Sequence, residues 1–139
     1  MLSILKRARQ IGNFAVRFHD SPSEIETEWR ALEARGVGSV FQSYAWCATW
    51  CRIAAGPSGD TPLIVVGRTM CGRIAFILPF ALRQAWSGTQ LCWLAQNCSA
   101  HNMGLYERGA SSSLDGETVR AIIDAARSVR PDLTCVNLH

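Results

Sequence analysis

The chain has 139 residues and a mass of 15.3 kDa, a length that fits one compact domain. Hydrophobic residues make up 48% of the sequence and charged residues 18%, which excludes wholesale disorder. The net charge of +3 is too small to require a nucleic-acid partner, and we expect none. The expected organisation is an N-terminal tail, residues 1–11, followed by a single domain over residues 12–139.

The cysteines and the apolar runs bear on the compartment. No signal-peptide pattern follows the basic N-terminus, and most of the six cysteines lie in apolar stretches, where a reduced thiol packs as a small hydrophobe. The longest uncharged apolar run, Ile74–Leu82, has nine residues and contains a proline. A membrane-spanning helix needs about 20. We therefore expect a cytoplasmic protein with no transmembrane segment.

The first elements are a strand and a helix. Residues 13–19 alternate between apolar and polar side chains, which predicts a half-buried strand. Ser21–Glu24 then combines a capping serine, a proline at the first helical position and a glutamate three residues after the cap. Trp29 lies on the apolar stripe that follows, and Gly36 supplies a stop, so the sequence predicts a short amphipathic helix.

A second helix is predicted over Ser43–Ala55, because its apolar residues form a wide stripe and a Gly-Pro-Ser-Gly run ends it. Three tryptophans of these two helices, Trp29, Trp46 and Trp50, are expected in the core. Trp86, beside a serine and a glycine, is the tryptophan expected to be exposed.

Four strands are predicted next. Pro62–Arg68 and Arg73–Leu82 are joined by four residues at hairpin spacing, and both are so apolar that burial on two faces is expected. Thr89–Ala95 is a third strand and Asn102–Glu107 a weaker fourth.

The C-terminal region has a helix pattern over Ser111–Val129, with acidic residues in its first turn and arginines near its end, and then a strand pattern over Thr134–Leu138. The full order is strand, two helices, four strands, helix and strand. This order predicts an α+β fold whose mixed, largely antiparallel sheet is flanked by helices.

The residues expected to contact a substrate follow the third of these strands. Gln96, Asn97, His101 and Asn102 form a polar loop, and Tyr106 closes the next strand. Loops after buried strands are places where a scaffold displays binding groups, and histidine can serve as a general base near neutral pH. The loop is also typical of chains with no function there. The sequence identifies no catalytic residue.

Two other kinds of chemistry remain open on the cysteines. Cys98 and His101 have ligand-like spacing, and Cys47 and Cys51 share a helix face, but a structural zinc needs four ligands from paired motifs. Cys98 and His101 could also act as nucleophile and base, which requires a site that stabilises the thiolate. Gly36 and Gly38 follow a helix, so a helix stop is favoured over a phosphate cradle.

Taken in order, several segments resemble the CelD/BcsL family of acetyltransferases, which is linked to cellulose biosynthesis. The resemblance covers roughly residues 12 to 138. The segments that carry it are Trp29–Leu32, Phe41–Trp46, Pro62–Arg68, Gly72–Ala75, Leu78–Leu82 and Leu91–Ala95.

This resemblance implies the GNAT fold and a protein similar to the FemAB-like transferases, in which two such units lie in tandem. In those proteins the second unit normally carries the acyl-CoA pocket, and the first packs against it and helps to shape the acceptor cleft. The chain matches the first unit and has no copy of the GNAT pyrophosphate loop, whose backbone N–H groups face the phosphates.

The function expected from the resemblance is that of the N-terminal half of an N-acyltransferase. Such an enzyme moves an acetyl or acyl group from acyl-CoA to an amine, with acetyl-CoA as cofactor and a second GNAT-like unit as partner. This chain would be inactive alone. The alternative is a non-catalytic interaction module that pairs with its own copy or a partner through the sheet edge near residues 133–139.

Overall fold

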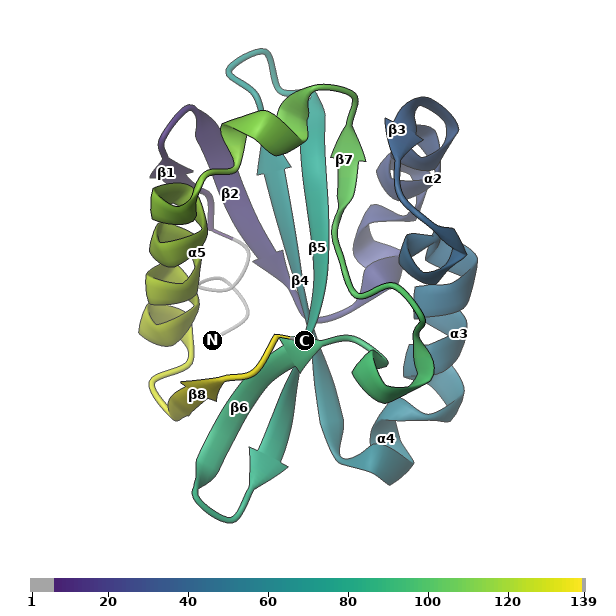
Figure 1. The fold of residues 1–139 in the computed structure, drawn as a ribbon, viewed down its shortest axis with the longest axis vertical. Coiled ribbons are helices and arrows are strands. Elements are labelled where there is room, and N and C mark those ends of the chain that lie inside the picture. Colours follow the sequence, from purple (N-terminus) through teal and green to yellow (C-terminus); the bar gives the residue numbers. More distant parts are fainter. Residues whose placement is uncertain (1–6, 139) are drawn as a thin grey trace.

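A computed structural model describes residues 7–138 (Figure 1). Its strands are β1 (Arg9–Ile11), β2 (Phe14–His19), β3 (Gly36–Val37), β4 (Asp60–Arg68), β5 (Ile74–Ala85), β6 (Gly88–Trp93), β7 (Leu105–Glu107) and β8 (Leu133–Val136). Its α-helices are α2 (Glu26–Arg35), α3 (Tyr44–Ile53), α4 (Ala55–Ser58) and α5 (Gly116–Val129). Four short 3-10 segments are η1 (Pro22–Ile25), η2 (Val40–Gln42), η3 (Gln96–Cys98) and η4 (Ala110–Ser113).

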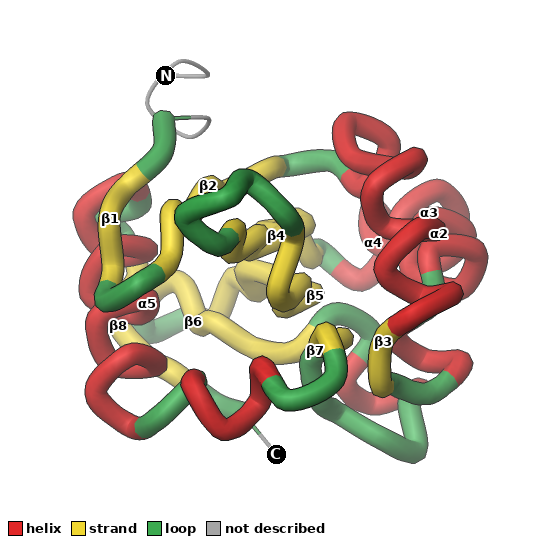
Figure 2. Tube along the Cα trace, turned by 90° about the horizontal axis from the view of Figure 1, so that it is seen from above, coloured by secondary structure: helices red, strands yellow, loops and turns green. Residues whose placement is uncertain are grey.

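All the strands belong to one sheet with the order β1-β2-β4-β5-β6-β8, and β7 pairs with both β3 and β5. Among the strand pairs of the described chain, β6 with β8 is parallel and the others are antiparallel. Helix α5 lies on one face of the sheet, and α2 and α3 lie on the other (Figures 1 and 2). The predicted α+β fold with a mixed, largely antiparallel sheet is confirmed.

Alternation along the central strands gives each face its own core. In β4, Leu63 and Val65 pack toward α5, whereas Ile64 and Val66 pack toward α2 and α3. Because both sets of side chains are buried, the strand is apolar without a break. The prediction that β4 and the apolar part of β5 are covered on both faces is confirmed.

Strand β5 changes partners at Pro79. Its first half pairs with β7 and its second half with β6, on the same edge. At the junction the Leu94 N–H donates to the Pro79 carbonyl at 2.8 Å. The N–H and C=O of an antiparallel residue face the same neighbour, so the N–H that proline lacks would face this junction. A proline is tolerated in mid-sheet because no strand there needs that donor.

The N-terminal part differs from the prediction in two ways. The expected tail lies partly outside the described residues, and Arg9–Ile11 forms β1, which pairs with β2. The predicted helix start at Ser21–Glu24 is a 3-10 turn, η1, and its capping box does not form. Ser21 Oγ instead lies 2.8 Å from Ser23 Oγ, and Glu24 Oε2 lies 3.2 Å from His19 Nδ1. The α-helix therefore begins at Glu26.

The tryptophans also divide differently from the prediction. Trp29 is fully buried and Trp86 fully exposed, as predicted. Trp46 and Trp50 are only half-buried, which corrects their expected place in the core. Helix α3 is apolar on both sides: Tyr44 and Cys47 are buried on its inner face, and Trp46 and Trp50 pack against the same core cluster but stay partly accessible.

Among the helices of residues 7–138, none is both long and apolar enough to cross a membrane.

Candidate functional site

A crevice lies between α5 and the sheet, at the end where β6 and β8 stop pairing. Its volume is ≈ 190 Å³.

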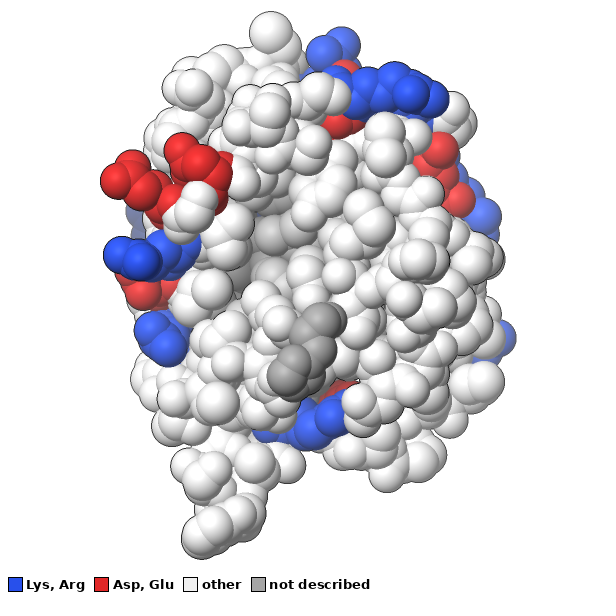
Figure 3. Space-filling view, in the orientation of Figure 1, with Lys and Arg blue, Asp and Glu red and all other residues white. Residues whose placement is uncertain are grey.

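 In Figure 3 the face that carries the crevice is almost free of charged side chains, which gather at its margins. The residues that line the crevice are Leu78, Phe80, Trp93, Tyr106, Ser111, Leu114, Val119 and Leu138.

Two aromatic side chains form the sheet side of this crevice. Trp93, the last residue of β6, packs on Phe80 with 4.8 Å between ring centroids. Tyr106 on β7 is half-buried, and burial raises the pKa of its hydroxyl. Its ring lies over Gly104, where an added Cβ would come within 2.8 Å of the Tyr106 hydroxyl oxygen. Glycine at position 104 therefore lets Tyr106 face the crevice.

Gln96 has a structural role at the end of β6. Its Oε1 accepts the Trp93 N–H at 3.0 Å, whereas two residues earlier the Leu91 carbonyl still accepts the Asn137 N–H across the β6–β8 pair. The buried side chain of Gln96 thus satisfies a backbone donor that β8 does not reach. Gln96 shapes the mouth of the crevice and does not line it.

Asn102 lies on the other side of Trp93. Its Nδ2 donates to the Gln96 carbonyl at 3.2 Å, and its Oδ1 is buried without a hydrogen-bond partner among residues 7–138. A narrow space, too small for a water, separates Asn102 from Trp93 and Phe41. Asn102 and Gln96 are therefore brought together by the loop that the sequence singled out.

His101 and Asn97 are exposed and do not reach the crevice. The His101 ring lies 6.2 Å from the Phe41 ring, and its carbonyl accepts a hydrogen bond from Gln42 Nε2 at 2.6 Å. Phe41 in turn packs on Trp46 of α3, whereas Tyr106 packs in the core beneath α5. The five residues predicted to bind substrate are thus divided between the two faces of the sheet.

Sequence reasoning missed most of the crevice. Its lining residues come from β5, β6, β7, η4, α5 and the segment after β8, so no local spacing connects them. The signal that could have found part of it is the alternation along β6, which directs Leu91 and Trp93 to the same face.

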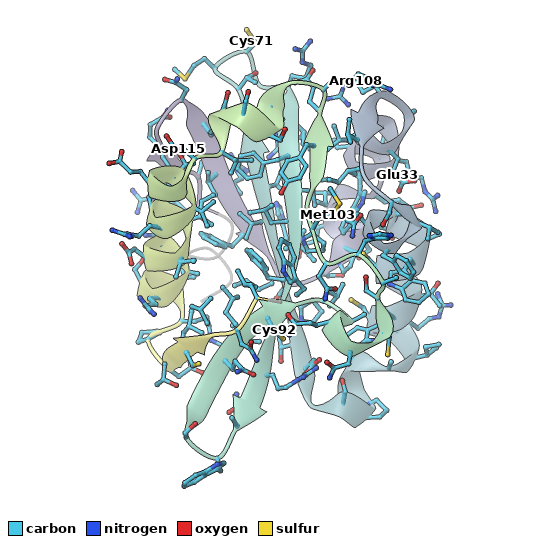
Figure 4. The ribbon with its side chains drawn as sticks, viewed as in Figure 1. Glu33, Cys71, Cys92, Met103, Arg108 and Asp115 are labelled. Carbon is cyan, nitrogen blue, oxygen red and sulfur yellow. The ribbon has the colours of Figure 1, made fainter. Side chains whose placement is uncertain are left out.

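Two carboxylates lie at the start of α5. Asp115 caps the helix, with its Oδ1 accepting the Thr118 N–H at 2.8 Å, and Glu117 lies in the first turn. The hydrogen bond from the Thr118 backbone lowers the pKa of Asp115, so this carboxylate is ionised at neutral pH. Figure 4 shows Asp115 at the edge of the molecule. A phosphate would meet two negative charges here.

A wider groove of ≈ 450 Å³ lies at the opposite side of the sheet, between the turn after β2 and α3. Ser21, Ser23 and Arg52 supply polar groups, and Tyr44 and Pro62 supply apolar surface. Cys51 also lines it, but burial raises the pKa of this thiol to about 11. A protonated thiol is a poor nucleophile, so the groove offers no activated cysteine.

Within residues 7–138 no three His, Cys, Asp or Glu side chains form a group that could hold a metal ion. Cys98 and His101 are both exposed, and the His101 N–H donates to Ser99 Oγ at 3.2 Å. No base is oriented toward the Cys98 thiol by a contact in the described chain.

The chain matches no protein-family model, no curated protein and no solved structure.

Proposed function

We propose that this chain is the N-terminal GNAT-like unit of an N-acyltransferase that moves an acetyl or acyl group from acyl-CoA to an amine. In this proposal the unit does not bind the cofactor. The acceptor enters the crevice between α5 and the sheet, and a second GNAT-like unit supplies acyl-CoA.

The observation that carries this division of labour is the capped start of α5. Helix α5 is a 14-residue helix that lies between β7 and β8 in the chain, and a helix start is where backbone N–H groups can face a pyrophosphate. Here Asp115 already accepts one of those N–H groups, and Glu117 adds a second negative charge. Repulsion between these carboxylates and a pyrophosphate argues against a cofactor site at this helix.

The chemistry of the crevice supports an acceptor role. No charged side chain lines it, and Tyr106 and Ser111 supply its hydroxyl groups. A mostly apolar pocket with a few polar groups orients a ligand by the hydrogen bonds that it can offer. The Tyr106 hydroxyl, whose raised pKa keeps it protonated, can donate one such bond.

Calorimetry with acetyl-CoA tests the first part of the proposal. The purified chain is expected to give no saturable heat, and tight binding would overturn the division of labour. The reading frame that encodes the chain, extended through a second unit, is expected to yield a protein that binds acetyl-CoA and releases free CoA only with an amine present.

The crevice is tested in that two-unit protein. Tyr106→Phe is expected to raise the KM for the acceptor and to leave the affinity for acetyl-CoA unchanged, because in this proposal the crevice holds the acceptor and the second unit holds the cofactor. His101→Ala, on the other side of the sheet, is the matched control and should leave the KM unchanged. An effect of His101→Ala larger than that of Tyr106→Phe would move the acceptor site away from the crevice.

The alternative, a non-catalytic interaction module, is favoured by the position of β8. Strand β8 ends the sheet order and pairs with β6 on one side, so within the described residues its other edge is open. Such an edge can accept an extended segment. If no amine supports acyl transfer by the two-unit protein, the non-catalytic interaction module becomes the favoured function.

A further inference from the structure

The crevice between α5 and the sheet has a wall on each side. Phe80 and Trp93 line it from the sheet, whereas Leu114 and Val119 line it from the start of α5 and the residues just before this helix. The two walls belong to layers that pack face to face (Figures 1 and 2). A space between two packed layers is bounded on both sides, so a flat group fits it better than a bulky one.

The size of the crevice matches that of one ring. Its volume is ≈ 190 Å³, and six of its eight lining residues have neither a hydroxyl group nor a charge. An apolar protein cavity of about 150 Å³ takes up one benzene molecule. The crevice therefore has room for a single ring and a short substituent.

The sheet side of the crevice favours an aromatic ring. Trp93 and Phe80 already form a tilted pair, with 4.8 Å between ring centroids and 42° between ring planes. Aromatic rings attract one another in such arrangements, because the negative face of one ring meets the positive edge of another. Phe80 is almost fully buried and Trp93 only half-buried, so Trp93 offers the more accessible surface to a third ring.

Charge decides what the ring can carry. No charged side chain lines the crevice, and burial of an unpaired ammonium is costly, so the charged end of an amine has to stay outside. Asp115 and Glu117 lie between Leu114 and Val119 in the chain. Their carboxylates favour a cation over an anion at this end of the crevice.

We propose that the crevice binds a single aromatic ring that a short chain joins to a positively charged amine, with the ring against Trp93 and the ammonium in water outside. This inference names the class of acceptor for the acyl transfer, and its interpretation as an acceptor rests on the proposed function. The binding itself does not, because the crevice lies within this chain and requires neither acyl-CoA nor a second unit.

Titration of the purified chain with phenethylamine at low salt, followed by heteronuclear NMR, tests the inference. The signal of the Trp93 indole N–H is expected to shift and to saturate. Ethylamine, which lacks the ring, should bind at least about tenfold more weakly, because it buries no ring surface. Phenylpropionate, a ligand of similar size and opposite charge, should also bind more weakly. The absence of a saturable shift with phenethylamine overturns the inference, and so does equal binding of either comparison compound.

Filling the crevice tests its location. Val119→Trp should weaken the binding of phenethylamine at least about tenfold, because the larger side chain takes the place of the ring. Ser111→Trp repeats the test at an exposed lining position, where the fold is less at risk. Val40→Trp is the matched control, because Val40 is 64% exposed in η2 and does not line the crevice, and it should leave binding unchanged. Circular dichroism verifies that each variant is folded.

The two proposals fail separately. Saturable binding that folded Val119→Trp and Ser111→Trp variants retain would overturn the ring site, whatever the two-unit protein does. Phenethylamine that binds in the crevice but is not acylated by the two-unit protein would leave the ring site in place and count against the acyltransferase.

Discussion

The helices that cover the two faces of the sheet differ in the side chains that they leave accessible to solvent. Helix α5 buries Ile122, Ala126 and Val129 and presents charges to solvent. Helix α3 buries Tyr44 and Cys47, leaves two tryptophans partly accessible and exposes Ile53. Both helices pack against the same sheet, so the difference lies on their outer faces. A well-packed inner face therefore does not imply that the outer face of the same helix is polar.

The largest expected effect concerns the core that lies between the sheet and helices α2 and α3. Trp29→Ala removes a fully buried ring whose Nε1 donates to the Gln42 carbonyl at 2.9 Å. We expect a loss of about 4 kcal/mol in the free energy of unfolding, from the cavity and the lost hydrogen bond. Urea unfolding at neutral pH measures it.

Ile122→Ala is the matched variant on the α5 face, and its expected loss is about 3 kcal/mol. A similar cost on both faces would show that their inner packing is equivalent and that only the outer sides differ. A loss below about 1 kcal/mol in the free energy of unfolding for Trp29→Ala would mean that the core beneath α2 and α3 is loosely packed, contrary to the complete burial of this ring.

These core positions show what the sequence could predict. The apolar runs of β4 and β5 identify buried strands because both faces of the sheet are covered. The outer face of α3 could not be predicted, because a helix that is apolar on both sides has no single stripe to orient it. Strand β3 was missed because it has two residues, and its pairing with Glu107 and Tyr106 depends on a distant part of the chain.

The candidate site was predictable only in part. Tyr106 lines the crevice, whereas the Gln96 side chain accepts the Trp93 N–H at the end of β6. A polar side chain in a loop is equally suited to bind a ligand or to satisfy a nearby backbone group. The residue at which β6 stops pairing with β8 decides between these two roles. The sequence does not indicate where two strands diverge.

A smaller effect is expected from acid at the far end of α5. Asp132 accepts hydrogen bonds from Arg130 and from Thr89 Oγ1, and Arg130 lowers its pKa from 3.8 to about 2. This contact therefore adds stability that is fully present above pH 3.8 and is lost as the pH falls toward 2. Because the carboxylate is largely exposed, the contribution is modest.

Asp132→Asn should remove this pH-dependent part and leave the rest of the acid profile. The difference between the urea midpoints of the two proteins, followed from neutral pH downward, measures it. A difference that stays constant as the acid is added would contradict the role assigned to the charge.

The smallest expected effect concerns the start of α5. Asp115→Ala removes the side chain that caps the Thr118 N–H, so the melting temperature should fall slightly. Asp115→Asn keeps a capping oxygen without the charge and should retain most of the stability. An Asp115→Asn variant that melts as low as Asp115→Ala would contradict the capping role of this side chain.

Through its backbone, Pro79 keeps the gap between β6 and β7 on the edge of β5 open. Its carbonyl is already bonded to Leu94, and it has no N–H to offer. No extra segment can pair with β5 at this point, whatever residues the connecting loop carries. The loop over residues 95–104 can therefore vary in sequence without closing this gap in the sheet.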